Sequence, residues 1–299
     1  MGSVRDERLL RPDGRVVAWS ETGVEGGRPL VRLPGTPGSR LSLRADQAPW
    51  FERRLRVITV ERPGFGASTR LPGRGFTEHA DDLAAILDHL GIDRAPLFGG
   101  SGAAPHVLAF AARHPDRVSA ATIVSGAAPM TEPELAAEIG FNAASDRLAR
   151  DRDVAGLRAL LGAAREAILA APVDGFRRLL ADAPATDQAI MKDAGWQAAL
   201  PDGLLEALAP GVDGWIDEVI AINGDWADIE LDRIRTSIVW THGEADANCP
   251  LPAARRLVAR IPGCRLVVHA DGGHYTGSSR EVELLDELLE RAGAAAAAC

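Results

Sequence analysis

Three polar residues in separate parts of the chain carry the side chains that nucleophilic catalysis uses. Ser101 lies in the run GGSGA, Asp246 in HGEADANCP and His274 in ADGGHYT. A serine hydroxyl becomes a nucleophile when an imidazole accepts its proton and a carboxylate orients that imidazole. These residue types therefore indicate acyl transfer at a carbonyl carbon, provided that the fold brings them together.

Each of these residues also has a simpler interpretation. Ser101 could be one small residue in a glycine-rich turn. His106 is a rival base, but it follows Ser101 on the same expected helix and would point about 140° away from it. Asp271 is a rival acid, although its place in the same short loop as His274 makes an approach to the imidazole awkward. We expect the other histidines to be structural or solvated: His79, His89, His114, His242 and His269.

Short apolar runs alternate with longer helical patterns along the chain. We expect strands at 15–20, 30–33, 56–61, 95–100, 119–126, 237–243 and 265–270. We expect helices at 39–54, 76–91, 102–114, 251–261 and 279–292. Such alternation indicates a mostly parallel sheet with helices on both faces. Catalytic groups in such sheets gather past the carboxyl ends of strands, where Ser101, Asp246 and His274 are expected to lie.

One helical stretch without a convincing strand interrupts this alternation. We therefore predict a core formed by residues 1–129 and 233–299 and a helical cap formed by residues 130–232. A capping-box pattern joins Thr131 and Glu134 near the start of this cap. Four prolines are expected to divide the cap into short helices: Pro172, Pro184, Pro201 and Pro210.

Composition narrows the classes of partner. The 299 residues carry a net charge of -9, and a single lysine, Lys192, occurs among 33 basic residues, so nucleic acid is a poor candidate. The sequence has no apolar run long enough to span a membrane and no apparent secretory signal. Three cysteines without a CxxC pair favour a reduced, cytoplasmic protein, and the Arg and Ala bias suggests a bacterial source. We expect a monomer or homodimer that acts on a small molecule.

Two kinds of cofactor site are disfavoured by spacing. A zinc pattern would need widely separated ligands: Cys249, Cys264, His269 and His274. Asp193 follows Lys192, so no GxxxxGK[ST] motif exists, and PGFGAS lacks the third glycine of a dinucleotide fingerprint. We therefore expect neither a metal nor an organic cofactor.

Five segments in order resemble those of the α/β-hydrolase family, across residues 8 to about 292. LPGTPGSR resembles the family's oxyanion loop, ERPGFGAS a neighbouring loop, and GGSGA the turn that displays the nucleophile. HGEAD and GGH correspond to the segments of the acid and the base. Two departures are Ala103, where the family usually has glycine, and Pro34, where it commonly has histidine.

The resemblance implies an α/β fold with a mostly parallel eight-stranded sheet, helices on both faces and a helical cap. It implies a serine hydrolase in which Ser101 attacks, His274 takes the proton and Asp246 orients the imidazole. The backbone N–H groups of Gly102 and Thr36 would bind the oxyanion, so the side chain of Thr36 should matter little. Activity should rise with pH near the reference histidine pKa of about 6.5.

The apolar cap favours a small or medium carboxylic ester as substrate, with Trp196 and Trp215 as candidates for lining the acyl pocket. Two alternatives stay open. The same fold hosts natural-product tailoring enzymes, including cyclases, lyases and hydrolases of C–C or amide bonds. Some relatives bind ligands without turnover. Fold does not decide among these functions.

Overall fold

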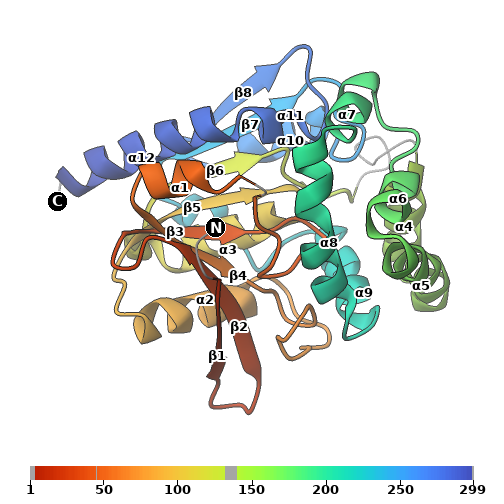
Figure 1. The fold of residues 1–299 in the computed structure, drawn as a ribbon, viewed down its shortest axis with the longest axis horizontal. Coiled ribbons are helices and arrows are strands. Elements are labelled where there is room, and N and C mark those ends of the chain that lie inside the picture. Colours follow the sequence, from red (N-terminus) through yellow and green to blue (C-terminus); the bar gives the residue numbers. More distant parts are fainter. Residues whose placement is uncertain (1–3, 45, 132–139, 298–299) are drawn as a thin grey trace.

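The computed structural model describes residues 4–44, 46–131 and 140–297, and an eight-stranded sheet forms its centre (Figure 1). The strand order across the sheet is β1-β2-β4-β3-β5-β6-β7-β8. The strands are Arg5–Leu10 (β1), Val16–Gly23 (β2), Arg28–Leu33 (β3), Leu55–Val60 (β4), Ala95–Gly100 (β5), Val118–Val124 (β6), Ile238–Gly243 (β7) and Arg265–His269 (β8). β1 and β2 are antiparallel to their neighbours, and the pairs from β4 to β8 are parallel. The predicted mostly parallel sheet is confirmed.

Helices cover both faces of the sheet, as the sequence predicts. Val31 and Ile58 pack on the face covered by α2 (Thr77–His89), α3 (Ala104–Arg113) and α10 (Leu251–Val258). Leu30 and Val57 pack on the opposite face, with α1 (Ala48–Glu52) and α12 (Glu281–Ala297). Successive side chains of a strand point to opposite faces. Strands buried on both faces therefore read as continuous apolar runs.

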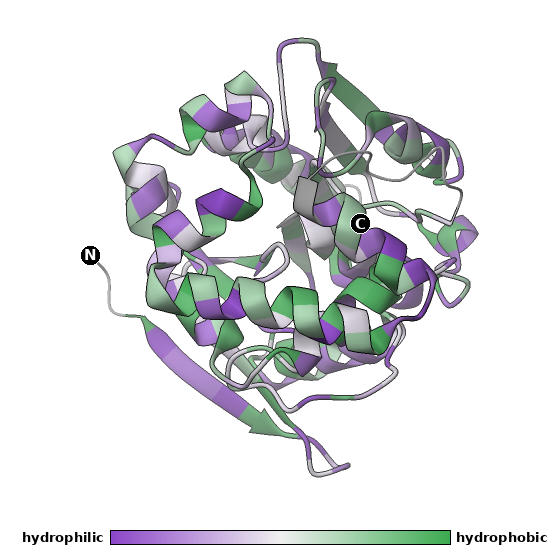
Figure 2. Cartoon of the chain, turned by 90° about the vertical axis from the view of Figure 1, so that its right-hand side faces the viewer, coloured by the Kyte–Doolittle hydropathy of each residue, from purple (hydrophilic) through white to green (hydrophobic). Residues whose placement is uncertain are grey.

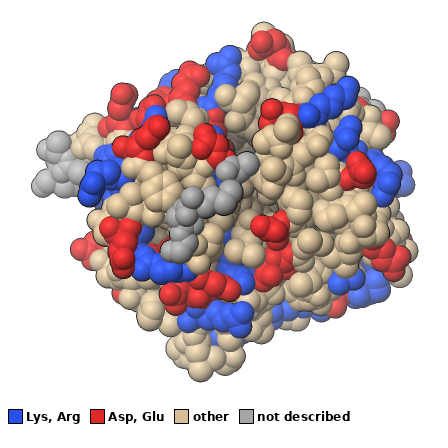
Figure 3. All heavy atoms as spheres, viewed as in Figure 1, with Lys and Arg blue, Asp and Glu red and all other residues tan. Residues whose placement is uncertain are grey.

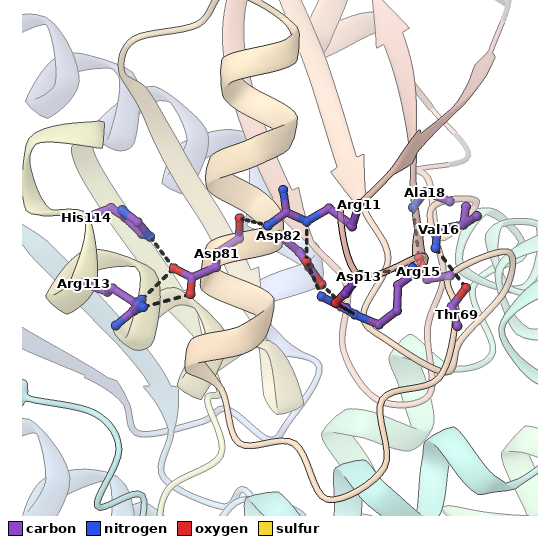
Figure 4. Close-up of polar contacts among 11 residues, drawn as sticks. Arg11, Asp13, Arg15, Val16, Ala18, Thr69, Asp81, Asp82, Arg113 and His114 are labelled. Carbon is purple, nitrogen blue, oxygen red and sulfur yellow. Dashed lines mark hydrogen bonds and ion pairs between the residues drawn. The ribbon is translucent and has the colours of Figure 1, made fainter.

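The first strand was missed in the sequence because its residues, RDERLL, are mostly polar and partly exposed. Strand β1 is an edge strand, and the turn after it is held by ion pairs to α2 (Figure 4). Arg15 Nη1 lies 2.7 Å from Asp82 Oδ2, and Arg11 Nε lies 3.1 Å from Asp82 Oδ1. Charged side chains are common on edge strands, where they discourage pairing with other chains.

The helix expected at 39–54 is wrong for most of its length, because only Ala48–Glu52 is helical. Ser39 and Arg40 instead bond to distant parts of the chain. Ser39 Oγ donates to the carbonyl of Gly203 at 3.0 Å, and Arg40 Nη1 lies 2.6 Å from Glu61 Oε1. These tertiary contacts outweigh the local helical preference.

The part of the chain from 140 to 222 is helical, as expected. Its helices are Gly140–Arg150 (α4), Val154–Ala170 (α5), Pro172–Leu179 (α6), Ala185–Ile190 (α7), Ala194–Leu208 (α8) and Asp213–Ile222 (α9). Figure 2 views the molecule from their side and shows hydrophobic and hydrophilic residues alternating along them. They enclose an apolar cluster that includes Leu161, Leu204 and Trp215. The division into a core and a cap stays a prediction.

Two predictions concern local features of the expected cap, residues 130–232. Pro201 was expected to end a helix, but it lies inside α8, which continues to Leu208. Leu204 and Leu208 beyond the proline are buried in the apolar cluster, and this packing offsets the backbone hydrogen bond that proline removes. Glu134 of the proposed capping box lies outside the described residues.

The surface of the face shown in Figure 3 mixes acidic and basic side chains and has no large area of one sign. Within the described ranges, no helix is both long and apolar enough to cross a bilayer.

Candidate active site

Ser101, His274 and Asp246 meet in one hydrogen-bonded row, although they are far apart in the sequence. His274 Nε2 lies 3.1 Å from Ser101 Oγ. On the other side of the ring, His274 Nδ1 lies 3.0 Å from Asp246 Oδ2 and 3.1 Å from Oδ1. A serine, an imidazole and a carboxylate in this order have the geometry of an activated nucleophile.

Ser101 occupies a strained turn between β5 and α3. Its φ is +54°, in the left-handed region that non-glycine residues adopt rarely. Residues Ser101–Ala103 form a short 3-10 turn, and α3 follows with Pro105 in its first turn. The sharp turn presents the serine at the carboxyl end of the sheet, as in the nucleophile elbow of this fold.

Gly102 is required by a close approach of the oxyanion loop. A Cβ at this position would lie 2.2 Å from Thr36 Oγ1. Gly35 of the same loop is also near Ser101, since a Cβ on Gly35 would lie 3.3 Å from Ser101 Cβ. The structure therefore places both predicted oxyanion residues, Gly102 and Thr36, directly beside Ser101.

Asp246 lies past the end of β7 and is held from several directions. Its Oδ1 accepts backbone N–H bonds from Asn248 at 2.9 Å and Cys249 at 2.8 Å. His242 Nε2 lies 3.3 Å from Oδ2 and donates to the carbonyl of Cys249 at 2.7 Å. Because Trp240 Nε1 donates to His242 Nδ1 at 3.1 Å, the proton of neutral His242 lies on Nε2. His242 thus has the structural role expected from the sequence, and it supports the carboxylate.

His274 is buried beside this carboxylate, and two effects on its pKa oppose each other. Burial lowers the pKa, while the charge and hydrogen bond of Asp246 raise it, and the net result is a pKa well above 6.5. The pH at which His274 becomes a free base is therefore higher than the sequence-based expectation of about 6.5.

A carboxylate from the helical segment holds the loop that carries His274. Asp187 of α7 is buried, and it accepts the backbone N–H of His274 at 2.9 Å and that of Tyr275 at 2.8 Å. The preceding Gly273 leaves room for this contact, because a Cβ there would lie 2.4 Å from Asp187 Oδ2. Sequence reasoning missed Asp187, since one aspartate in a helical segment carries no local signal of a contact so far along the chain.

The oxyanion loop is held from behind by Arg62 of the ERPGFGAS segment. Arg62 Nη2 donates to the carbonyl of Gly35 at 2.7 Å, and Nη1 donates to the carbonyl of Pro34. The Gly35–Thr36 peptide is trans, so its N–H points opposite to its carbonyl. By holding the Gly35 carbonyl, Arg62 also fixes the direction of the Thr36 N–H. The loop that contains Pro34 is thus held by two hydrogen bonds from Arg62.

The Thr36 hydroxyl has hydrogen-bond partners of its own, and the expectation that this side chain matters little for activity stays a prediction. Its Oγ1 donates to Glu218 Oε1 at 3.1 Å and accepts from Arg62 Nη2 at 3.1 Å. Thr36 therefore joins the oxyanion loop to α9, the helix that carries Glu218.

Glu218 is the centre of a buried group of charges that sequence reasoning did not identify. Arg62 Nε lies 2.9 Å from Glu218 Oε1, Arg74 pairs with Oε2, and His106 Nε2 lies 3.1 Å from Oε1. Burial raises the pKa of Glu218, but the two arginines lower it well below its usual value. Burial lowers the pKa of His106 to about 4, so this residue is a buried, neutral hydrogen-bond donor rather than a rival base. The rival acid, Asp271, is exposed.

Two cavities open beside the row formed by Ser101, His274 and Asp246. One has a volume of about 100 Å³ and the other about 730 Å³. Both are lined by Ser101 and His274. Trp215 lines the smaller cavity and Trp196 the larger one, where its ring meets that of Tyr275 at a centroid distance of 5.5 Å. The two tryptophans thus lie in different cavities rather than in one pocket.

Within the parts of the chain that the structure describes, no three His, Cys, Asp or Glu side chains are grouped to hold a metal ion.

Known proteins with similar sequences and structures share this architecture. The family model described as alpha/beta hydrolase fold matches residues 28–278. The chain is 26% identical to a proline iminopeptidase of Xanthomonas citri, over 93% of this chain and 92% of that protein. It is 28% identical to a 2-hydroxymuconate semialdehyde hydrolase of Pseudomonas putida, over 87% and 84% of the two chains. An alpha/beta hydrolase fold protein from Nakamurella multipartita has a similar solved structure, with a TM-score of 0.66, 25% identity and coverage of 97% and 100%.

Proposed function

Because the chain belongs to the alpha/beta hydrolase fold family, we propose that it is a serine hydrolase that cleaves small or medium carboxylic esters. The observation that carries this proposal is the row of hydrogen bonds from Ser101 through His274 to Asp246. Each member has a role that its contacts support. Ser101 is the nucleophile, His274 the general base and acid, and Asp246 the group that orients the imidazole.

The reaction has two halves. Ser101 Oγ attacks the ester carbonyl while His274 Nε2 takes its proton, and a tetrahedral intermediate forms. This intermediate collapses to an acyl-enzyme as the C–O bond breaks, and His274 returns the proton to the leaving alcohol. Water then attacks the acyl carbon with His274 as base, and the carboxylic acid and free Ser101 are released.

The backbone N–H groups of Gly102 and Thr36 would bind the negative oxygen of each tetrahedral intermediate. Two features support this role. Gly102 lies in the 3-10 turn that leads into α3, where backbone N–H groups lack helical partners. The Thr36 N–H is directed by the contact of Arg62 with the Gly35 carbonyl, so little reorganisation is needed when the charge forms.

The cavities favour an ester with an apolar part. Phe176 and Tyr275 line both cavities, Trp215 the smaller one and Trp196 the larger one. Apolar walls with a few placed polar groups are typical of small-molecule sites. The combined space suits small and medium substrates.

Cleavage of an amide or a C–C bond is the second candidate. Two relatives favour it, one named a proline iminopeptidase and the other a 2-hydroxymuconate semialdehyde hydrolase. The same Ser101 and His274 would act in each reaction, so the site geometry alone does not choose the bond.

Turnover of a matched panel tests the choice. We expect the purified chain to hydrolyse alkyl and aryl esters with higher kcat/KM than the corresponding anilides or diketones. Ser101→Ala should lose most of this activity with any substrate, because a triad acts as a unit. A faster reaction with an anilide or a diketone would assign the second function, and unchanged ester turnover in Ser101→Ala would reject the serine mechanism.

A further inference from the structure

The smaller cavity beside Ser101 contains a polar pair that the proposed chemistry does not use. Asp146 comes from α4, and Asn223 is the residue that follows α9. They are 7% and 6% exposed, respectively, and both line the cavity of about 100 Å³ that Ser101 and His274 also line. This pair therefore faces the same space as the reacting groups.

The hydrogen bonds of Asn223 fix the orientation of its amide. Nδ2 donates to the carbonyl of Val219 at 3.0 Å and to Asp146 Oδ1 at 3.0 Å. The reversed amide would place its oxygen against these two oxygens, which is unfavourable. Both amide hydrogens are thus used, and Oδ1 is left as an acceptor.

With Asp146 ionised, the pair consequently offers two acceptors and no free donor. Asn223 Oδ1 and Asp146 Oδ2 are buried and have no hydrogen-bond partner among the residues that the structure describes. Burial raises the pKa of Asp146 to about 6, against the opposing effects of Asn223 and the positive Arg150. Buried polar atoms without partners are costly, and a cavity of this size leaves room for a ligand group that supplies the missing donors.

We propose that Asp146 and Asn223 form a subsite that binds an O–H or N–H group on the substrate, away from the bond that is cleaved. The inference rests on the proposed ester hydrolysis and narrows its substrate class. The preferred ester carries a hydroxyl or an amino group, in its acyl or its alcohol part, and is not a purely alkyl ester. The apolar lining residues Trp215 and Ile222 would contact the carbon chain between that group and the ester.

A substrate series with a single changed group measures this preference. The acyl series consists of ethyl alkanoates from propanoate to octanoate with a methyl, hydroxyl or amino terminus. The alcohol series consists of alkyl acetates with the same three termini. For the best chain length in at least one series, we expect kcat/KM to be about 10- to 100-fold higher with a donor terminus than with methyl.

Substitutions then connect the preference to the pair. In Asp146→Leu, the ratio of kcat/KM between donor and methyl termini should fall to about one or below, because the variant lacks both carboxylate acceptors. Asp151→Leu, an exposed change just after the same helix, should keep the wild-type ratio. Asp146→Asn distinguishes a hydroxyl terminus from an ammonium terminus on the substrate. It should keep part of a preference for hydroxyl but lose a preference for an ammonium group that depends on the negative charge.

A binding measurement separates this inference from the proposed reaction. In Ser101→Ala, calorimetry should show tighter binding of hydroxy- or amino-alkanoic acids than of the matching alkanoic acids. Adding Asp146→Asn to this variant should weaken the binding of the amino-alkanoic acids. If wild-type enzyme shows no donor preference at any chain length, the subsite is rejected. It is also rejected if Asp146→Leu leaves every preference unchanged. If the leucine variant does not fold, the same result with Asp146→Asn rejects it. If the wild-type enzyme hydrolyses no ester but the binding preference is present, the proposed function is rejected and the subsite is kept.

Discussion

The contact between His274 and Asp246 determines the pH at which the proposed base is available. His274 accepts a proton only when its imidazole is neutral. Its pKa is lowered by burial and raised more strongly by Asp246, so that the net pKa lies well above 6.5. The neutral fraction therefore increases as the pH rises through this elevated value.

This predicts that kcat/KM rises with pH and reaches half its maximum above about pH 6.5. The profile should be measured with a slow ester, and the imidazole of His274 should be titrated by NMR in Ser101→Ala as an independent readout. A midpoint at or below about 6.5 in both experiments would contradict the assigned contact between the imidazole and the carboxylate.

Arg62 gives a second prediction for single residues, because its planar guanidinium holds two carbonyls of the oxyanion loop. Lysine keeps the charge but cannot reproduce this fork. We expect Arg62→Lys to lower kcat by about 10- to 100-fold with little change in KM, since a misdirected Thr36 N–H weakens binding of the oxyanion rather than the substrate.

Arg70→Lys is the matched control, because Arg70 is an exposed arginine paired with Asp217 just beyond the same segment. Its kcat should match that of the wild type. Circular dichroism should show that both variants are folded. Wild-type kcat in a folded Arg62→Lys would show that Arg62 does not position the donor.

The elements of the core were largely predictable, whereas their irregular parts were not. Seven strand candidates follow from apolar runs, since strands buried on both faces differ clearly from the helices between them. Strand β1 was missed because its own residues are mostly polar, and the helix expected at 39–54 failed because Ser39 and Arg40 bond to other elements. The second error arises because tertiary contacts determine the backbone there and local preference does not.

Helix α7 provides a test at the scale of elements, because its Asp187 accepts two backbone N–H bonds from the loop of His274. Asp187→Asn leaves one acceptor oxygen and places an amide N–H group against one of the two backbone N–H donors. We expect kcat to fall by about 10-fold, corresponding to one charge-assisted hydrogen bond. Asp187→Ala should cost more.

Asp182→Asn is the control for this change, since Asp182 is exposed just before α7. The assay should record kcat, KM and the NMR-detected pKa of His274 together. A role limited to stability would lower the melting temperature and leave kcat and the histidine titration as in the wild type, and this result would argue against positioning by Asp187.

Contacts between the helical segment 140–222 and the rest of the molecule are not revealed by sequence patterns. The order of Ser101, Asp246 and His274 is visible in the sequence because each follows a strand. The roles of Glu218 and Asp187 cannot be read from the sequence, because their partners are distant in the chain. Glu218 pairs with Arg74, 144 residues away, and Asp187 accepts from His274, 87 residues away. Such pairs depend on how the helical segment lies on the sheet, and no local period encodes that placement.

Glu218→Gln should reduce the free energy of unfolding by about 3–5 kcal/mol, because it leaves the buried Arg62 and Arg74 without their shared carboxylate. Urea unfolding at neutral pH measures this loss. Since the pKa of Glu218 is lowered in the folded state, its contribution is present above the unfolded glutamate pKa and disappears as the pH falls through the folded value.

The difference between wild type and Glu218→Gln should therefore shrink on acidification below about pH 4.5. Glu166→Gln, an exposed change on α5, should have little effect at any pH. If Glu218→Gln is as stable as the wild type at neutral pH, the ion pairs do not hold the helical segment on the core.

The covalent intermediate on Ser101 tests the central claim most directly. A rapid-quench reaction with a p-nitrophenyl ester, followed by mass spectrometry of the digested protein, locates the acyl group. We expect a burst of p-nitrophenol and an acyl adduct on the peptide that contains Ser101, with both absent from Ser101→Ala. Steady ester turnover with no adduct on Ser101, or an adduct that persists in Ser101→Ala, would contradict the assignment of Ser101 as the nucleophile.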